Sequence, residues 1–280
     1  MNQLTTEKRV QILGCLTEGM SLRGISRITG VSINTTLKLI VDLGTACQAY
    51  QDATLRNLPC KRIQADEIWS FVQCKARKAQ GKPGCGDLWT WVGLCADTRL
   101  AVHWRVGDRH AGEAFMFIHE LKTRLANRVQ LTTDGHAAYL SAVETVFGAE
   151  VDYAQLVKLY GMPPEGNPER RYSPAQCIGA RKVTISGSPD MANVSTSYVE
   201  AQNLTLRMNC RRFARLTNAH SKKRENHAHA VAINYCVHNF VKIHSSLRCT
   251  PAMAAGISKT VWELADVIGL LDANGAAKAA

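Results

Sequence analysis

The hydrophobic periodicity of the chain changes twice, and this order limits the folds that it can adopt. Apolar residues recur at helical spacing over residues 6–44, short β-branched or aromatic runs follow over residues 63–157, and helical spacing returns over residues 195–247. Helices on either side of a group of strands predict a mixed α+β or α/β fold. The length of 280 residues is enough for two modest domains.

Breaks in these patterns predict the domain boundaries. A helical domain is expected over residues 1–50, a linker over residues 51–62 and a second domain over residues 63–257. The segment GMPPEGNPERRYSP, residues 161–174, contains four prolines and is expected to be a surface excursion from the second domain. Residues 258–280 form a predicted C-terminal tail, whose last residues, DANGAAKAA, are expected to fray.

The balance of charge indicates a polyanionic partner. Lys and Arg number 34 against 23 Asp and Glu, which gives a formal net charge of +11. Such an excess is most often associated with nucleic-acid binding. No apolar stretch approaches the roughly 20 residues that cross a bilayer, and the first residues, MNQLTTEKRV, lack the apolar core of a signal peptide. We therefore expect a cytoplasmic protein with no membrane partner.

Ten cysteines are spread over the chain without a CxxC pair. This spread is typical of reduced thiols that are buried as small hydrophobic side chains. The alternative is a metal site built from Cys74, Cys85, Cys95 and a histidine.

Residues 21–44 have the capping pattern of two short successive helices. Ser21 and Ser32 can cap them, and Gly30 can supply the left-handed turn between them, which predicts a helix-turn-helix layout. The positions expected to be buried are Leu22, Ile25, Ile28, Val31, Leu37 and Ile40. The positions that a recognition helix would present to the major groove of DNA are Ile33, Asn34, Thr35 and Lys38. The alternative is an αα-hairpin that serves only for packing or as a dimer contact.

Three acidic residues occupy positions of chemical interest. Asp66 lies within the predicted strand KRIQADEIWSFV, which opens a three-stranded antiparallel meander. Asp134 ends the short predicted strand VQLTTDG, and open α/β sheets place their sites at such strand ends. Glu200 lies in the opening turns of the helix predicted from SYVEAQNLTLRMNCRRFARLT. The residues that share its face by their spacing are Asn203, Arg207 and Arg211.

Together these segments resemble a known family. The arrangement is similar to the ribonuclease-H-like catalytic core of DDE transposases. The blocks DEIWSFV, TTDGHAAY, SYVEAQNLTLRMNCRRFARLTNAHSKK and HNFVKIHSSLRCTPAMAAGI resemble bacterial transposases of the insertion sequence one family, and the resemblance covers residues 15–257. It implies a mixed sheet flanked by helices and preceded by an all-α helix-turn-helix domain. Members of the family often start with a cysteine-rich zinc-binding segment, whereas this chain begins at the helix-turn-helix, so no zinc is expected.

The resemblance implies that Asp66, Asp134 and Glu200 are catalytic, with Asp66 bridging two metal ions and the other two acids each completing one shell. Two Mg²⁺ ions, for which Mn²⁺ can substitute, would activate water and stabilise the leaving 3′ oxygen of a phosphodiester, and they prefer oxygen ligands. The implied partner is double-stranded DNA, both the transposon terminal repeats and the target. A bacterial nucleoid location and at least a dimer are implied as well. The alternative is three unrelated surface or capping acids.

A cluster of cations follows Glu200 in the sequence. No acid occurs between residues 207 and 224, and cations in such a run can form a track for phosphates. The seven cations are Arg207, Arg211, Arg212, Arg215, Lys222, Lys223 and Arg224. With Asn203, which can orient a water or a phosphate, they are predicted DNA contacts. For any single cation the alternative is a solvated helix face.

Two other functions are compatible with parts of the sequence. One is a helix-turn-helix DNA-binding regulator whose second domain has lost catalysis. The intact acids argue against this regulator, because a non-catalytic domain has little use for clustered carboxylates. The other is a nuclease of the same fold that cuts DNA and never joins ends.

Overall fold

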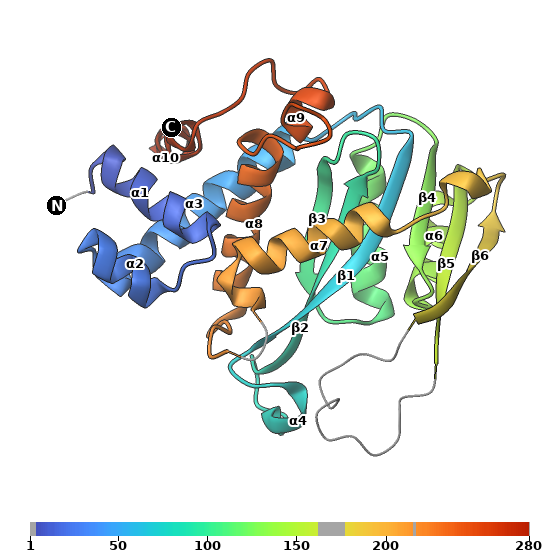
Figure 1. Ribbon diagram of the computed structural model, residues 1–280, viewed down its shortest axis with the longest axis horizontal. Helices are drawn as coiled ribbons and strands as arrows, with labels where there is room; N and C mark the ends of the chain where they lie inside the picture. The colour runs from blue at the N-terminus through green and yellow to red at the C-terminus, as the bar shows by residue number, and fades with distance from the viewer. Residues whose placement is uncertain (1–3, 162–176, 215–216, 280) are drawn as a thin grey trace.

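The computed structural model describes residues 4–161, 177–214 and 217–279 (Figure 1). Its centre is a six-stranded sheet in the order β3-β2-β1-β4-β5-β6. The strands are β1 (Arg62–Val72), β2 (Gly86–Cys95), β3 (Ala101–Gly107), β4 (Val129–Asp134), β5 (Val151–Tyr160) and β6 (Cys177–Ser186). Because β1 pairs antiparallel with β2 and parallel with β4, the sheet is mixed. A mixed sheet flanked by helices is consistent with the predicted ribonuclease-H-like fold.

The antiparallel meander predicted from the sequence is confirmed. β2 pairs antiparallel with both β1 and β3, and Asp97 and Thr98 lie in the turn that joins β2 to β3. β6 was not predicted, because it is an edge strand with mostly exposed side chains and no clean alternation; it pairs antiparallel with β5. The predicted excursion at residues 161–174 lies outside the described residues except for Gly161.

Helices cover both faces of the sheet (Figure 1). α5 (Ala111–Thr123) and α6 (Ala138–Phe147) pack on one face, while α7 (Ser197–Asn209) and α8 (Arg224–Phe240) pack on the other. Successive side chains of β1 point to opposite faces of the sheet. Ala65 belongs to the core under α5 and α6, and Ile68 packs with α7 and α8 on the other face. The same alternation directs Asp66 towards α7 and Glu67 towards α5 and α6. The short helical segments are α4 (Ala76–Ala79), η2 (Met191–Asn193) and η3 (Arg211–Phe213).

The N-terminal helices begin where the capping residues predict. They are α1 (Thr6–Thr17), α2 (Leu22–Thr29) and α3 (Ile33–Thr54). Ser21 Oγ accepts a hydrogen bond from the amide of Gly24, and Ser32 Oγ accepts one from the amide of Thr35. Gly30 has φ 72° and ends α2 in the left-handed conformation. Ile28 differs from its expected burial, since it lies on the outer side of the short α2 with 55% of its surface exposed.

α3 is longer than its sequence pattern predicts. The linker expected over residues 51–62 begins inside this helix, which continues through Thr54 because Cys47 and Gln51 near its end are buried. Gln51 donates a hydrogen bond from Nε2 to the carbonyl of Ala232 in α8 at 3.1 Å, and Cys47 belongs to the main core cluster. The division of the chain into two domains stays a prediction; in the structure α3 and α8 pack closely together.

The C-terminal segment also differs from the expected frayed tail. After α9 (Pro251–Ala254), the chain forms α10 (Leu264–Ala279), which continues through most of the stretch predicted to fray. Val267 and Ile268 of α10 are buried in the same core cluster as Leu43 of α3. Burial of these apolar side chains stabilises the helix, because an isolated helix of this length is only marginally stable in water. Among the described residues, no helix is both long and apolar enough to span a bilayer.

α7 is shorter than its sequence pattern predicts. It ends at Asn209, Cys210 is extended with φ −113° and ψ 105°, and η3 follows. Phe213 is buried, with its ring centroid 4.7 Å from that of His227. The chain turns here to insert Phe213 into the core. Arg211 therefore does not share a helical face with Glu200, contrary to the sequence prediction.

Candidate active site

Asp66 and Asp134 lie side by side because β1 and β4 are parallel neighbours. Ala65 pairs with Thr133 in the register of these strands, and the two aspartates are the next residues on each. β4 ends at Asp134 whereas β1 continues to Val72, which pairs with Ser221, so within the described residues the edge of β1 is open from Glu67 to Phe71. Asp66, Glu67 and Asp134 each place a carboxylate oxygen within 4.8 Å of the other two.

Glu200 and Asn203 reach the same place from α7. One cavity of about 660 Å³ is lined by Asp66, Asp134 and Glu200 together with Asn203. Asn203 donates a hydrogen bond from Nδ2 to Asp66 Oδ2 at 2.9 Å, and Glu200 forms a 2.7 Å ion pair with Lys158 of β5. The fold thus brings the three predicted acids, which are far apart in the sequence, to one cavity, and adds Glu67 to them.

Burial and mutual repulsion act on these acids. Desolvation, and then the charge of Asp134, raise the pKa of Asp66 to about 6. The same two causes raise the pKa of Glu67 to about 8, although Arg109 opposes the shift. When folding raises the pKa of a carboxyl, this group favours folding at pH values below its pKa in the unfolded chain, which is about 4. Its contribution to stability is lost as the pH rises through its pKa in the folded protein. The acid cluster therefore opposes folding most strongly at pH 8 and above.

Basic groups partly balance the acids. Arg109 Nε lies 3.4 Å from Glu67 Oε1, and its Nη2 lies 3.9 Å from Asp134 Oδ2. The Arg109 guanidinium sits over the Trp89 ring, 4.6 Å from its centroid, which holds the side chain in place. His136 Nε2 is 3.6 Å from Glu67 Oε1, and burial lowers the pKa of His136 below its usual value. Among the described residues that line the cavity, the basic side chains are Arg109, Lys158 and Arg207.

The donor set of this cavity fits a hard divalent cation. Four carboxylates line it, and Mg²⁺ prefers such oxygens while it keeps positions for water and phosphate. Within the described chain, Asn203 Oδ1 is buried without a hydrogen-bond partner, so it is open to a water of a bound ion. A second group of ligand-type side chains, Asp108, His110 and Glu113, lies at the start of α5, where Asp108 also forms an ion pair with Arg224. Neither group includes a cysteine, and all ten cysteines are free thiols.

Mg²⁺ or Mn²⁺ is expected to raise the melting temperature of the protein at pH 8. At ten times its Kd, an ion that binds only the folded state adds about 1.4 kcal/mol, which corresponds to roughly 3 °C for a chain of this size. The measurement is a thermal melt with and without the ion, with EDTA as the metal-free reference. Asp66→Ala is expected to lose most of the shift, whereas Glu150→Gln, at an exposed carboxylate that pairs with Lys122, should keep it. An equal shift in Asp66→Ala would contradict a shared site.

The four predicted DNA contacts of α3 are exposed at its first turns. Ile33, Asn34, Thr35 and Lys38 all face outward, as expected for a recognition helix. Lys38 forms an ion pair with Asp42, one turn later, at 2.5 Å. This pair reduces the charge that Lys38 presents. Contact of these four residues with DNA stays a prediction.

The predicted contacts after Glu200 divide into groups in the structure. Arg207 lines the carboxylate cavity, and Asn203 is buried there against Asp66. Arg211, Arg212 and Lys222 line a second cavity near α2. Lys223 is exposed, Arg224 is paired with Asp108 at 3.5 Å and Arg215 lies outside the described residues.

Sequence reasoning missed three side chains of the carboxylate cavity. Glu67 was not among the predicted site residues, because its local signal is the DE pair in DEIWSFV and a single pair of this kind has little specificity. At the open edge of β1 its carboxylate nevertheless reaches Asp134. Arg109 and Lys158 come from segments without a local motif, and only the packing of α5 and β5 beside β1 and β4 brings them here.

Comparison with known proteins adds a distant likeness. No protein-family model matches the chain, and no curated protein matches it. Among solved structures, a piggyBac transposase in a synaptic complex with hairpin DNA, determined by cryo-EM, is similar with a TM-score of 0.43 and 11% sequence identity. The alignment covers 97% of this chain and 72% of that one. At this distance, the assignment of a function depends on the geometry of the site.

Proposed function

We propose that this chain is a DDE-type DNA transposase of the insertion sequence one family, a polynucleotidyl transferase that cleaves and joins DNA strands. The observation that carries the proposal is the convergence of Asp66, Asp134 and Glu200 on one cavity. These acids come from two parallel strands and from a helix that crosses the sheet. Unrelated surface acids would have no reason to converge, because their mutual repulsion costs free energy.

The proposed roles of the residues follow from their contacts. Asp66, Asp134 and Glu200 would hold two divalent ions, which when bound activate water and stabilise the leaving 3′ oxygen. Asn203 orients Asp66 through its 2.9 Å hydrogen bond. Lys158, which pairs with Glu200 at 2.7 Å, would contact a substrate phosphate in this cavity. Arg207, on the wall of the same cavity, would contact the DNA backbone.

The reaction would proceed in two in-line displacements at phosphorus. In the first, water attacks a phosphodiester at the element end, the bond to the 3′ oxygen breaks, and a 3′ hydroxyl and a 5′ phosphate are released. In the second, this 3′ hydroxyl attacks a phosphodiester of the target, so that a new bond forms as the target strand breaks. Neither step forms a covalent bond to the protein.

The substrate would be double-stranded DNA, both the terminal repeats of the insertion sequence and the target. Ile33, Asn34, Thr35 and Lys38 would read the terminal repeat from the start of α3. Synapsis of two ends would require at least a dimer, and the place of action would be the bacterial nucleoid.

The test is a joining assay with the wild-type protein. A labelled duplex that carries the element's own end sequence is incubated with a plasmid target and Mg²⁺ or Mn²⁺. We expect a nicked end and a product in which the label is joined to the plasmid. Cleavage without joining would favour a nuclease, and binding without cleavage would favour a regulator.

A further inference from the structure

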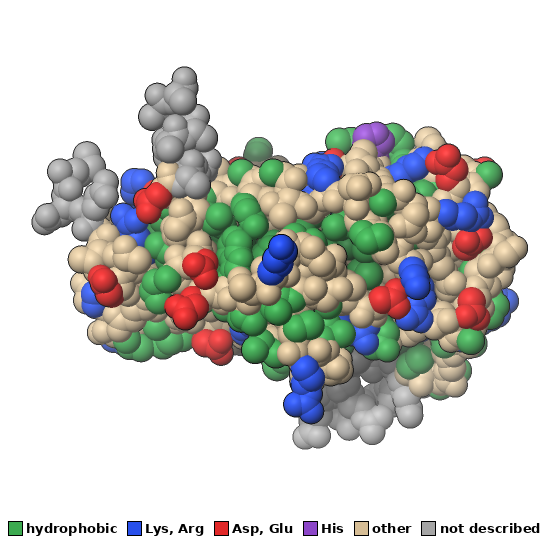
Figure 2. Space-filling model, turned by 90° about the horizontal axis from the view of Figure 1, so that it is seen from above, with side chains coloured by type: hydrophobic (Ala, Val, Ile, Leu, Met, Phe, Trp, Pro, Cys, Tyr) green, Lys and Arg blue, Asp and Glu red, His purple; other side chains and the backbone are tan. Residues whose placement is uncertain are grey.

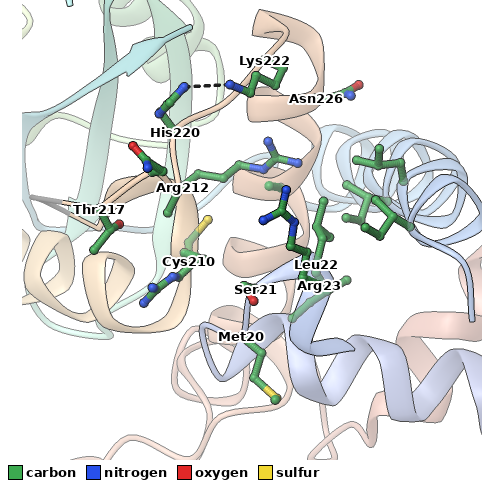
Figure 3. Close-up of a pocket in the computed structure, with 18 of the residues that line it drawn as sticks. Met20, Ser21, Leu22, Arg23, Cys210, Arg212, Thr217, His220, Lys222 and Asn226 are labelled. Carbon is green, nitrogen blue, oxygen red and sulfur yellow. Dashed lines mark hydrogen bonds between the residues drawn. The ribbon is translucent and has the colours of Figure 1, made fainter. Parts of the chain in front are cut away.

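A second cavity of about 840 Å³ opens between the N-terminal helices and the end of α7 (Figure 3). We call it the interhelical cleft. Its walls are the α1–α2 turn, the starts of α2 and α3, residues 210–212 and 217–222, and one side of α8. The floor is apolar and is formed by Leu16, Leu22, Leu37, Ile40, Ala230 and Ile233. In Figure 3, the side chains of Arg23 and Arg212 approach this space from opposite walls.

The charge of the interhelical cleft has one sign. Arg23, Arg211, Arg212 and Lys222 line it, and no aspartate or glutamate is among the described residues that line it. Within the described chain, none of these four cations forms an ion pair with an acidic side chain. Arg212 donates a hydrogen bond from Nη1 to Ser221 Oγ at 3.1 Å, and burial lowers its pKa. A half-buried guanidinium without an acidic partner leaves a positive potential that an anion would neutralise.

Other parts of the surface differ from the interhelical cleft in their charge. On the face shown in Figure 2, basic and acidic side chains are interspersed. The excess positive charge of the chain is therefore not gathered on that face. The starts of α2 and α3 also reach the cleft through Leu22 and Ile33, and their partial positive ends add to the same potential.

The position of the interhelical cleft connects the two predicted functional regions. Ile33, at the start of α3, lies on one wall, and Arg211 lies on another. Arg207, four residues before Arg211 in the chain, lines the carboxylate cavity. The α1–α2 turn packs against the end of α7, since a side chain at Gly19 would meet the carbonyl of Met208. A strand that leaves the start of α3 would cross Arg211 and Arg207 before it reaches the acids.

We propose that the interhelical cleft binds the phosphodiester backbone of the DNA strand that runs from the start of α3 to the carboxylate cavity. The direction of that strand rests on the proposed function. The choice of an anionic occupant rests on the four cations and on the absence of acids among the described lining residues. Arg23, which was not among the predicted DNA contacts, becomes one. The cleft would place the cleaved phosphate at a set distance from the recognised sequence.

The experiment compares cations inside and outside the interhelical cleft. Arg23→Gln and Arg211→Gln remove exposed cations of the cleft. Arg27→Gln on α2 and Arg77→Gln on α4 are the controls, because both cations are exposed and neither is among the residues that line the cleft. The Kd for a fluorescent duplex is measured by anisotropy between 50 and 200 mM KCl. In each cleft variant, the slope of log K against log salt is expected to be less steep than in the wild type by about 0.9. Between 50 and 200 mM KCl, the affinity of the variant for DNA should therefore fall by a factor about threefold smaller than that of the wild type. The control variants should keep the wild-type slope.

The outcomes separate this proposal from the proposed function. If the cleft variants lose slope and the controls do not, the proposal stands even if the wild type neither cleaves nor joins DNA. If all four variants keep the wild-type slope, the proposal is overturned even if the wild type joins DNA normally. Unchanged DNA binding together with loss of binding to poly-glutamate in the cleft variants would overturn it in favour of an acidic protein segment.

Discussion

Asp66→Asn and Glu200→Gln are each expected to lower the rate of metal-dependent strand cleavage by about 1,000-fold or more. Each change removes a negative charge from the cavity and keeps the size of the side chain. Divalent ions at such a site stabilise the transition state by several kcal/mol, and about 4 kcal/mol corresponds to 1,000-fold in rate. Binding of the DNA end should remain, because the predicted recognition residues lie at the start of α3.

The measurement is single-turnover cleavage of a labelled element end, with the binding affinity determined in parallel. Glu150→Gln serves as the control, since its carboxylate is exposed and pairs with Lys122 away from the cavity. It should cleave at the wild-type rate. If Glu200→Gln cleaves like the wild type while Glu67→Gln does not, the third acid of the site is Glu67, which already lies within 4.8 Å of Asp66 and Asp134.

Gly44→Ala is expected to lower the free energy of unfolding by about 2 kcal/mol. A Cβ at this position of α3 would lie 2.4 Å from His229 Cβ and 2.7 Å from His229 Cα in α8. The backbone of α8 cannot turn aside as a flexible side chain would, so the helices must separate, and overpacking of this kind costs about 1–3 kcal/mol or more. The higher helix propensity of alanine returns at most about 1 kcal/mol. Urea denaturation of both proteins measures the difference.

Gly269→Ala is the matched control for this change. Gly269 is also within a helix, α10, and a Cβ there would meet nothing within 4 Å. Alanine should therefore leave stability unchanged or raise it slightly. Equal stabilities of Gly44→Ala and the wild type would show that α3 and α8 are not held as closely as the structure places them.

Local chemistry made several features predictable from the sequence. The caps Ser21 and Ser32 and the left-handed Gly30 act over three or four residues, so the starts of α2 and α3 follow from the residues alone. The meander and the position of Asp134 at a strand end follow from short apolar runs separated by turns. The expectation that Asp66, Asp134 and Glu200 meet depended on family resemblance, because spacing alone does not bring together residues so far apart.

The remaining features depend on contacts between distant segments. α3 continues through Thr54 because α8 covers its last turns, and α7 stops at Asn209 because Phe213 must enter the core. Ala65 of β1 pairs with Thr133 of β4, and β4 ends at the next residue. Because no residue of β4 lies beside Glu67, the carboxylate of Glu67 can reach the acid cluster. The interhelical cleft exists only where α2, α3 and α8 meet the end of α7. Periodicity and capping report interactions between near neighbours in the chain, whereas burial, ion pairing and cavities depend on which surfaces pack together.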